Sequence, residues 1–454
     1  MEYILYWQWG ILVLATLFLY YISPKAVTNE GFFAGAAIGD AKPNYFVLTF
    51  SLVISWIFAK SITNAANLGL SFGVVGGLAY AAYYLSFIVA GFVIYKLRVK
   101  GKFQSIHHFL NTKFGRSAII IFSLLIGIRL LNEIWSNSMV IGTYFGEQGS
   151  TGYILAIIVF TGLTLAYTLK GGLSSSLFSD VIQMGLFAVL LIVVLSLVFG
   201  KQGSITPFVQ SGEWSFAGGL DLFFVALIQI FSYPFHDPVM TDRGFITDER
   251  TTLKSFLTAG VLGFVFILLF SLIGVYGKPI GVNGQAAVEV AKTLGVVSMI
   301  IMNFIMITSA SSTIDSTFSS ISKLIVVDLG KQKSISVRKG RIAMILTAIG
   351  GTIPIFFSPT ILSATTISGT MVLGLAPVFI FWKIPAPKIS FYLAVAVGLI
   401  AGLIIVFGWF PENYNLTEGK YAGLLTVNFY ASILILILYF LPVIFNQFKM
   451  KKQL

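Results

Sequence analysis

Long apolar runs and short polar connections alternate along the whole chain. Thirteen runs are long enough to be considered as spans, at roughly 4–22, 44–70, 74–95, 117–146, 152–169, 174–199, 219–239, 255–277, 288–327, 341–357, 361–382, 389–409 and 423–446. About 20 apolar residues in a helix cross the hydrocarbon core of a bilayer. The pattern therefore predicts an all-α polytopic membrane protein with about 13 transmembrane helices.

Composition supports the same class. Of the 454 residues 57% are hydrophobic and only 10% are charged, against about 25% charged residues in soluble domains. The chain has no cysteine, which excludes disulfides, thiol catalysis and cysteine metal sites. The sequence contains no evident activated nucleophile, metal cluster or nucleotide-binding motif, so we do not expect an enzyme, and we expect no required protein partner.

The distribution of basic residues predicts the orientation. With the N-terminus outside, and with Lys292 and Arg341 at span ends counted with the adjoining loops, the cytoplasmic loops hold 22 of the 29 Lys and Arg residues, the outer loops hold four, and three lie within spans. Cytoplasmic loops of membrane proteins are enriched in Lys and Arg. The net charge of +12 thus reflects topology, not a nucleic-acid partner. We expect a cell-membrane protein, in a bacterial inner membrane, with its C-terminus in the cytoplasm.

Two spans carry signs of a broken helix. The span 44–70 contains "SWIFAKSITNAANLG", and the span 219–239 contains "SYPFHDPV", in which Pro234 and Pro238 disfavour a continuous helix. These spans start two groups of five helices and run in opposite directions, as in transporters with inverted repeats.

We therefore divide the chain into an extra N-terminal helix and loop (1–43), a first repeat (44–218), a second repeat (219–388), and two C-terminal helices with a basic tail (389–454).

A hydroxyl-rich stretch lies inside the span 288–327. Ten of the fifteen residues from Thr308 to Ser322 carry hydroxyls, and Asp315 lies among them. On a helix, one face would gather Ser309, Ser312, Thr313, Ser316 and Ser320. Such oxygens suit Na⁺ or K⁺, although serine and threonine also mediate close helix packing. The span exceeds one straight crossing, so we expect it to tilt or to extend into the cytoplasm.

Three motifs together resemble the sodium:solute symporter family. "SASSTIDSTFSSISKLIVVDL" at 309–329 resembles the eighth core helix of this family. "KGGLSSSLFSDVIQ" at 170–183 resembles its GGL signature, and "SLVISWIFAKSITNAANLG" at 51–69 resembles its first core helix. The resemblance covers essentially the whole chain. It implies a leucine-transporter-like fold with a 5+5 inverted repeat, and Na⁺-coupled symport of a small solute.

The resemblance also implies ion sites. The shared Na⁺ site would use carbonyls of Ile54, Ile57 and Ser309 and the hydroxyls of Ser312 and Thr313. A second Na⁺ site would use Asp180, Ser312, Asp315 and Ser316. Asp315 replaces a hydroxyl of the family pattern. It could strengthen a second cation site, or one of the two carboxylates could be protonated or paired with Lys323.

The solute is expected between the two breaks and the third core helix. Candidate solute-binding residues are Lys60, Ser61, Glu133, Tyr233, His236 and Asp237. In one interpretation Lys60 pairs with Asp237 and Arg129 with Glu133, as structural ion pairs. In the other, these charges bind an anionic or zwitterionic solute such as an amino acid or carboxylate. Proton-coupled or sodium-independent transport, and symport of a sugar or other neutral solute, remain alternatives.

Overall fold

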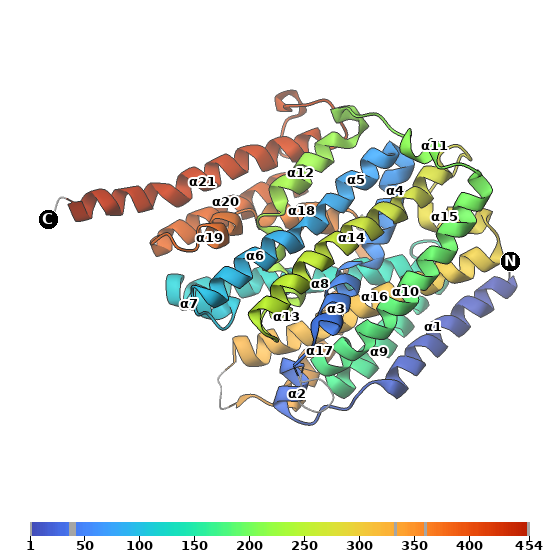
Figure 1. The fold of residues 1–454 in the computed structure, drawn as a ribbon, viewed down its shortest axis with the longest axis horizontal. Helices are drawn as coiled ribbons and strands as arrows, with labels where there is room; N and C mark the ends of the chain where they lie inside the picture. Colours follow the sequence, from blue (N-terminus) through green and yellow to red (C-terminus); the bar gives the residue numbers. More distant parts are fainter. Residues whose placement is uncertain (1, 36–41, 331–333, 358–360, 452–454) are drawn as a thin grey trace.

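The protein is described by a computed structural model that covers residues 2–35, 42–330, 334–357 and 361–451. The described residues form α-helices joined by short connections and turns (Figure 1). The N-terminus lies at one end of the helix bundle and the C-terminus at the other (Figure 1).

The helices that correspond to the first six predicted spans come first. They are α1 (Glu2–Ile22), α3 (Tyr45–Trp56), α4 (Ala59–Phe72), α5 (Val74–Ala81), η1 (Ala82–Leu85), α6 (Ser86–Val99), α8 (Arg116–Gly142), α9 (Thr151–Gly171) and α10 (Leu173–Gln202). Three short helices lie between these or after them: α2 (Asn29–Ala34), α7 (Ile106–Phe114) and α11 (Thr206–Val209).

The second half follows the same plan. Its helices are η2 (Phe216–Leu220), α12 (Asp221–Gln229), η3 (Tyr233–His236), α13 (Pro238–Arg243), α14 (Glu249–Gly277), α15 (Ala286–Thr293), α16 (Val296–Lys323), η4 (Leu324–Asp328), α17 (Val337–Thr352), η6 (Ile353–Phe357), α18 (Ser363–Met371), α19 (Leu375–Ile380), α20 (Lys388–Val406), η7 (Glu412–Tyr414) and α21 (Ala422–Lys451).

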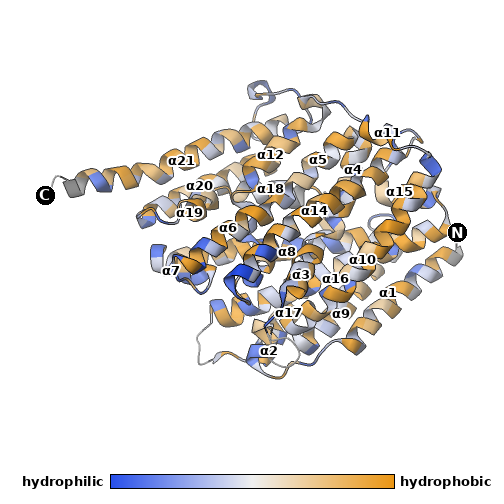
Figure 2. Cartoon of the chain, viewed as in Figure 1, coloured by the Kyte–Doolittle hydropathy of each residue, from blue (hydrophilic) through white to orange (hydrophobic). Residues whose placement is uncertain are grey.

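The all-helical membrane architecture is confirmed, but the predicted number of thirteen spans is not. Among the described residues ten helices are long and apolar enough to cross a bilayer, or eleven if the bent pair α3 and α4 is one span. The predicted spans 219–239 and 361–382 are not among these helices, because each is divided into helices too short to cross a bilayer. The colour of hydrophobic residues covers most of the length of the long helices, including α1 and α21 at the edges of the bundle (Figure 2).

The first predicted break lies between α3 and α4. The two helices meet at an angle of 58°, and Ile57 between them has ψ of 70°, outside the helical range. The segment has neither proline nor glycine at this point. Instead, side chains from other helices bind the carbonyls that the break frees: Tyr84 donates to Trp56, and Ser309 donates to Ile57. Tertiary contacts therefore stabilise the break, as is needed in a dry interior.

The second break separates α12 from α13. Helix η3 fills the gap, and Asp237, in an extended conformation, caps α13 by accepting a bond from the amide of Val239 at 3.0 Å. Pro238 occupies the first position of α13, where its missing N–H costs nothing. This break thus follows directly from the sequence "HDP".

The hydroxyl-rich span differs from its prediction. Residues 288–327 do not form one long tilted helix, because α15 ends before Gly295 and α16 begins after it. Gly295 has φ of 102°, a conformation that glycine adopts most easily. Helix α16 continues through η4 to Asp328 and packs between α10 and α8.

Glycines set the distance between α14 and α4. A Cβ atom on Gly274 would lie 1.7 Å from the carbonyl oxygen of Ala66, and one on Gly69 would lie 2.1 Å from that of Ser271. Both obstacles are backbone atoms, so side-chain rotation cannot relieve the clash. The two helices can therefore pack at this distance only with glycine at the crossing.

The variant Gly274→Ala tests this close packing. The added methyl group must separate α14 from α4, and overpacking of this kind typically costs about 1–3 kcal/mol. We expect a lower melting temperature of the purified protein in detergent. Gly162→Ala is the matched control, because nothing lies within 4 Å of a Cβ there. Equal melting temperatures of the two variants would contradict the close crossing.

Candidate ion and solute site

The hydroxyl face of α16 lies against the end of α3. The Ser309 hydroxyl donates to the carbonyl of Ile57. The Thr313 hydroxyl lies 3.5 Å from the carbonyl of Ser55 and 3.1 Å from that of Ser309. Ile54, one turn earlier in α3, is fully buried. The structure therefore brings the segments that carry the predicted shared Na⁺ ligands together around the break.

Ser312 points toward a neighbouring carboxylate. Its hydroxyl donates to Oδ1 of Asp180 on α10 at 2.5 Å. Oδ2 of Asp180 accepts from Ser51 at 2.5 Å and from Ser55 at 3.3 Å, both on α3. Asp180 is completely buried, so it links α10, α3 and α16 within the bundle.

Arg243, which the sequence analysis did not select, is the cation at this carboxylate. Its Nη2 lies 3.0 Å from Oδ2 of Asp180 and 2.9 Å from Oγ of Ser316. Its Nε donates to Ser51 at 2.6 Å. Arg243 ends α13 and is fully buried. The predicted span stopped at residue 239, which left this arginine in a cytoplasmic loop.

Asp315 is held by hydroxyl groups. Oδ1 accepts from Ser176 at 2.7 Å, while Oδ2 accepts from Tyr167 at 2.7 Å and from Ser179 at 2.9 Å. Among the described residues no ion pair involves Asp315. The suggested pairing with Lys323 is wrong, because Lys323 pairs with Asp242, the residue before the last of α13.

Four charged side chains meet where the two breaks face α8. Lys60 Nζ lies 2.6 Å from Glu133 Oε1. Arg129 pairs with Glu133, and its Nη2 lies 3.2 Å from Oδ2 of Asp237. Trp56 also donates to Asp237, at 2.8 Å. All four charged side chains are at most 3% exposed. Within this central charge cluster (Lys60, Arg129, Glu133 and Asp237), the partner of Lys60 is Glu133 and not Asp237.

Aromatic rings enclose the space beside the central charge cluster. A small cavity is lined by Trp56, Phe58, Ser61, Tyr80, Tyr83, Tyr84, Tyr233 and Thr365. Its volume is about 10 Å³, which is room for about one water molecule. The aromatic side chains therefore close the candidate solute site in this structure. The sequence analysis selected Ser61 and Tyr233 but missed Tyr80 and Tyr83, although "YAAYYL" marks an aromatic cluster.

His236 also faces this region. Its Nδ1 lies 2.5 Å from the carbonyl of Tyr233, and the two rings lie edge to face. Nε2 is buried and has no hydrogen-bond partner among the described residues. One ring nitrogen is thus left to bind another group.

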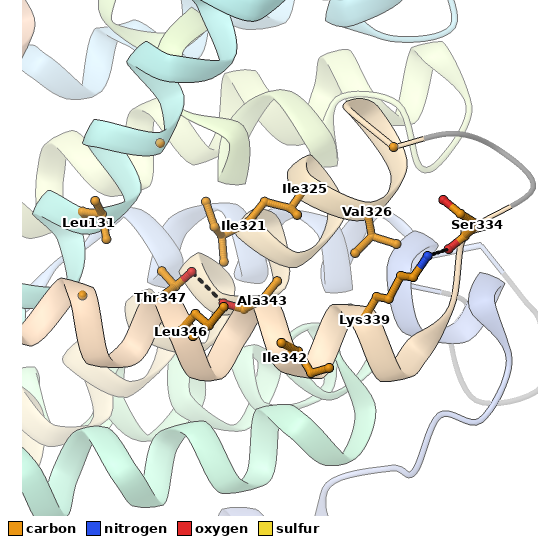
Figure 3. A pocket seen from close by; sticks show the side chains of 13 residues that line it. Leu131, Ile321, Ile325, Val326, Ser334, Lys339, Ile342, Ala343, Leu346 and Thr347 are labelled. Carbon is orange, nitrogen blue, oxygen red and sulfur yellow. Dashed lines mark hydrogen bonds between the residues drawn. The ribbon is translucent and has the colours of Figure 1, made fainter.

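A polar vestibule lies beyond the aromatic rings. A hollow of about 320 Å³ is lined by residues that include Asn64, Asn67, Thr143, Gln285 and Tyr421. The amide of Asn64 bonds to Tyr80, which also lines the small aromatic cavity. The vestibule and the closed site thus meet at Tyr80. A second groove, of about 670 Å³, lies between α8, α16 and α17, and its apolar side chains are separate from these groups (Figure 3).

No family model matches the chain. The chain is 23% identical over 211 residues to sodium/glucose cotransporter 1 of Mus musculus, which covers 43% of this chain and 31% of that protein. The match thus spans about a third of the length of this curated relative.

Solved structures match over a much larger part of the chain. A Na⁺-coupled sialic acid symporter in a substrate-bound outward-open state aligns with a TM-score of 0.67 at 17% identity, covering 97% of both chains. MhsT in complex with L-phenylalanine aligns with a TM-score of 0.54 at 16% identity, covering 87% of this chain and 97% of that chain.

The fold and the comparisons define the class. The chain has the leucine-transporter-type fold of secondary transporters, and these neighbours are transporters, not enzymes. It resembles the sodium:solute symporters. The resemblance predicted from the three motifs is thereby confirmed.

Glu133 is expected to be the most sensitive member of the central charge cluster. Glu133→Gln leaves Lys60 and part of Arg129 without their partner, and breaking a buried ion pair typically costs about 3–5 kcal/mol. The melting temperature of the purified protein should fall strongly. It should recover in part in Lys60→Gln combined with Glu133→Gln. Glu147→Gln, at an exposed position, is the control; an equally small effect at both sites would argue against the pairing.

Proposed function

We propose that this protein is a Na⁺-coupled symporter that moves a small anionic or zwitterionic solute by alternating access. The observation that carries the proposal is a pair of buried cations, Lys60 and Arg129, at the break between α3 and α4 and beside the hydroxyl face of α16. The candidate cation ligands and the candidate carboxylate partners thus lie around the same discontinuous helix.

Na⁺ is the proposed coupled ion at the shared site. The candidate ligands are the carbonyls of Ile54, Ile57 and Ser309 with the hydroxyls of Ser312 and Thr313. These are hard oxygen donors, and a helix break is where membrane transporters present free carbonyls to cations. The Ser309 hydroxyl lies at the carbonyl of Ile57. Rotation of this hydroxyl would free the Ile57 carbonyl for an ion without any change of the backbone.

The proposed solute carries a carboxylate. The central charge cluster contains two cations and two carboxylates, so its charges balance when no solute is present. A zwitterion can pair with both signs without adding net charge, and an anion can enter together with Na⁺. A neutral sugar could accept hydrogen bonds from the ammonium and guanidinium groups, but it could not neutralise either charge. Ser61, Tyr233 and the free Nε2 of His236 are the proposed polar contacts of the solute.

Entry of the solute requires the aromatic rings to separate. The closed cavity of about 10 Å³ is too small for any organic solute, whereas the vestibule beyond Tyr80 measures about 320 Å³. We propose that the vestibule is the outer access path and that Tyr233 and its neighbours close over the bound solute. Because α4 of the first repeat and α14 of the second are in backbone contact, we propose that these two helices rock together against the rest of the bundle to open the site.

The proposed location is the cell membrane of a bacterium, with the N-terminus outside and the C-terminus in the cytoplasm. The bias of Lys and Arg toward the loops assigned to the cytoplasm supports this orientation.

Transport in liposomes tests the proposal directly. The purified protein should take up its solute when an inward Na⁺ gradient is imposed, and not when a proton gradient alone is imposed. The solute is identified first by thermal stabilisation with amino acids, monocarboxylates, sugars and vitamins, each with and without Na⁺. Stabilisation by a neutral sugar alone, or uptake driven only by protons, would contradict the proposal.

Thr313→Ala should raise the Na⁺ concentration needed for half-maximal uptake by about tenfold or more, because a lost ligand worth about 1.4 kcal/mol changes affinity tenfold. Ser312→Ala should act in the same direction. Thr317→Ala, one turn along α16, is the matched control, since its hydroxyl bonds to the backbone of its own helix at 2.8 Å. Unchanged sodium dependence in both test variants would refute the site.

Lys60→Gln should weaken solute binding by about tenfold or more while changing Na⁺ binding little, because it removes a charge-assisted bond to the solute carboxylate. The combination with Asp237→Asn should not restore uptake. The control is Lys292→Gln, a half-exposed lysine that pairs with Glu289 and lies outside the central charge cluster. Near-normal solute affinity in the double variant would make Lys60 purely structural.

A further inference from the structure

We propose that Arg243 is a built-in cation that takes the place of a second Na⁺, so that this chain binds and transports only one Na⁺ with each solute. The inference rests on the Na⁺ coupling proposed above and concerns the number of ions. It follows from the contacts that Arg243 makes with the residues expected to form a second Na⁺ site.

The guanidinium already uses oxygens that a second Na⁺ would need. Two of the four candidate ligands accept hydrogen bonds from Nη2 of Arg243: Asp180 Oδ2 at 3.0 Å and Ser316 Oγ at 2.9 Å. The same nitrogen lies 3.2 Å from the hydroxyl of Ser55. An ion at this position would lie against a fixed positive charge.

The remaining oxygens of this site are also engaged. Oδ1 of Asp180 accepts from Ser312 at 2.5 Å, and both oxygens of Asp315 accept from hydroxyls at 2.7–2.9 Å. Hydroxyl groups can rotate and offer a lone pair to an ion. A guanidinium has only donors and does not lose its proton in proteins, so the position of Arg243 is the decisive feature.

The shared site differs in this respect. Ser309 and Thr313 contact only backbone carbonyls of α3 and α16, and among the described residues no ion pair or hydrogen bond joins either of them to a Lys or Arg. Ser55 contacts both places, through its carbonyl to Thr313 and through its hydroxyl to Arg243. The shared Na⁺ site and the position of the Arg243 guanidinium are thus neighbours. The second position already holds a cation of the chain itself.

The balance of buried charge agrees with one ion. Around the two breaks the chain buries three cations and four carboxylates; the cations are Lys60, Arg129 and Arg243, and the carboxylates are Glu133, Asp237, Asp180 and Asp315. With their formal charges these groups sum to one negative charge. In the empty site, and with a zwitterionic solute, one Na⁺ neutralises it, whereas a second would leave uncompensated positive charge in a dry interior, which is costly.

Arg243 can play this role because α13 follows a break. Asp237 caps α13, and Pro238 starts it, so α13 is a separate short helix that begins after the break. Arg243 at the end of this short helix reaches α3, α10 and α16 at once. A cation tethered in this way is supplied by the fold itself and leaves only when α13 moves.

Counting bound Na⁺ tests the inference without measuring transport. Saturating equilibrium binding of ²²Na⁺ to the purified full chain, at constant ionic strength with choline, should give one Na⁺ per chain for the wild type. Arg243→Gln removes the charge at similar length and should give two. Arg243→Gln combined with Asp180→Asn should return to one, which would place the additional ion at Asp180. Arg243→Lys, which keeps the charge, should remain at one.

The outcomes distinguish the role of Arg243 as a built-in cation from the Na⁺ coupling under Proposed function. Two Na⁺ per wild-type chain, or no gain in a folded Arg243→Gln variant, would overturn the built-in cation and leave Na⁺ coupling intact. No saturable Na⁺ binding to the wild type would overturn the coupling itself. If Arg243→Gln does not fold, the wild-type count still decides between one ion and two.

Discussion

The structure depends on the cost of burying charge in a membrane interior. Seven ionisable side chains lie within the bundle around the breaks of α3–α4 and α12–α13, and each is at most 3% exposed. A lone charge there is strongly unfavourable. Each charged side chain therefore needs polar or oppositely charged partners, and the packing of the helices must hold them at hydrogen-bond distance. The helix breaks allow this, because they bring side chains from α4, α8, α10, α13 and α16 to the same depth.

The breaks and the charges stabilise each other. The carbonyls freed at Trp56 and Ile57 are bound by Tyr84 and Ser309, and Asp237 both caps α13 and accepts from Trp56 and Arg129. A group that serves as a cap and as an ion-pair partner connects backbone geometry to electrostatics. Movement of a broken helix therefore changes the pairing of buried charges, which is a physical basis for coupling an ion to a solute.

Glycine contacts position this arrangement. At Gly274 and Gly69 the backbones of α14 and α4 come into contact, and α4 carries Lys60. Close packing of backbone on backbone leaves α4 little freedom to shift alone. Opening of the site is thus more easily achieved by moving α4 and α14 together than by bending α4 alone.

The sequence by itself determined the class of the protein and the local features of the site. Apolar runs gave the membrane helices, "HDP" predicted the second break, and the hydroxyl face of α16 was visible from helical periodicity. These features were accessible because they depend on neighbours within a few residues. The break at Gly295 was missed, since a glycine inside an apolar run does not by itself end a helix.

Only the tertiary structure decided which charges meet. Lys60 pairs with Glu133, 73 residues away, and Arg243 pairs with Asp180, 63 residues away. The sequence offered Asp237 as a partner for Lys60 and placed Arg243 in a loop. Pairing depends on the rotation and depth of separate helices, and no local pattern encodes these quantities. The sequence could therefore supply the charged groups, while the packing of the helices assigned their partners.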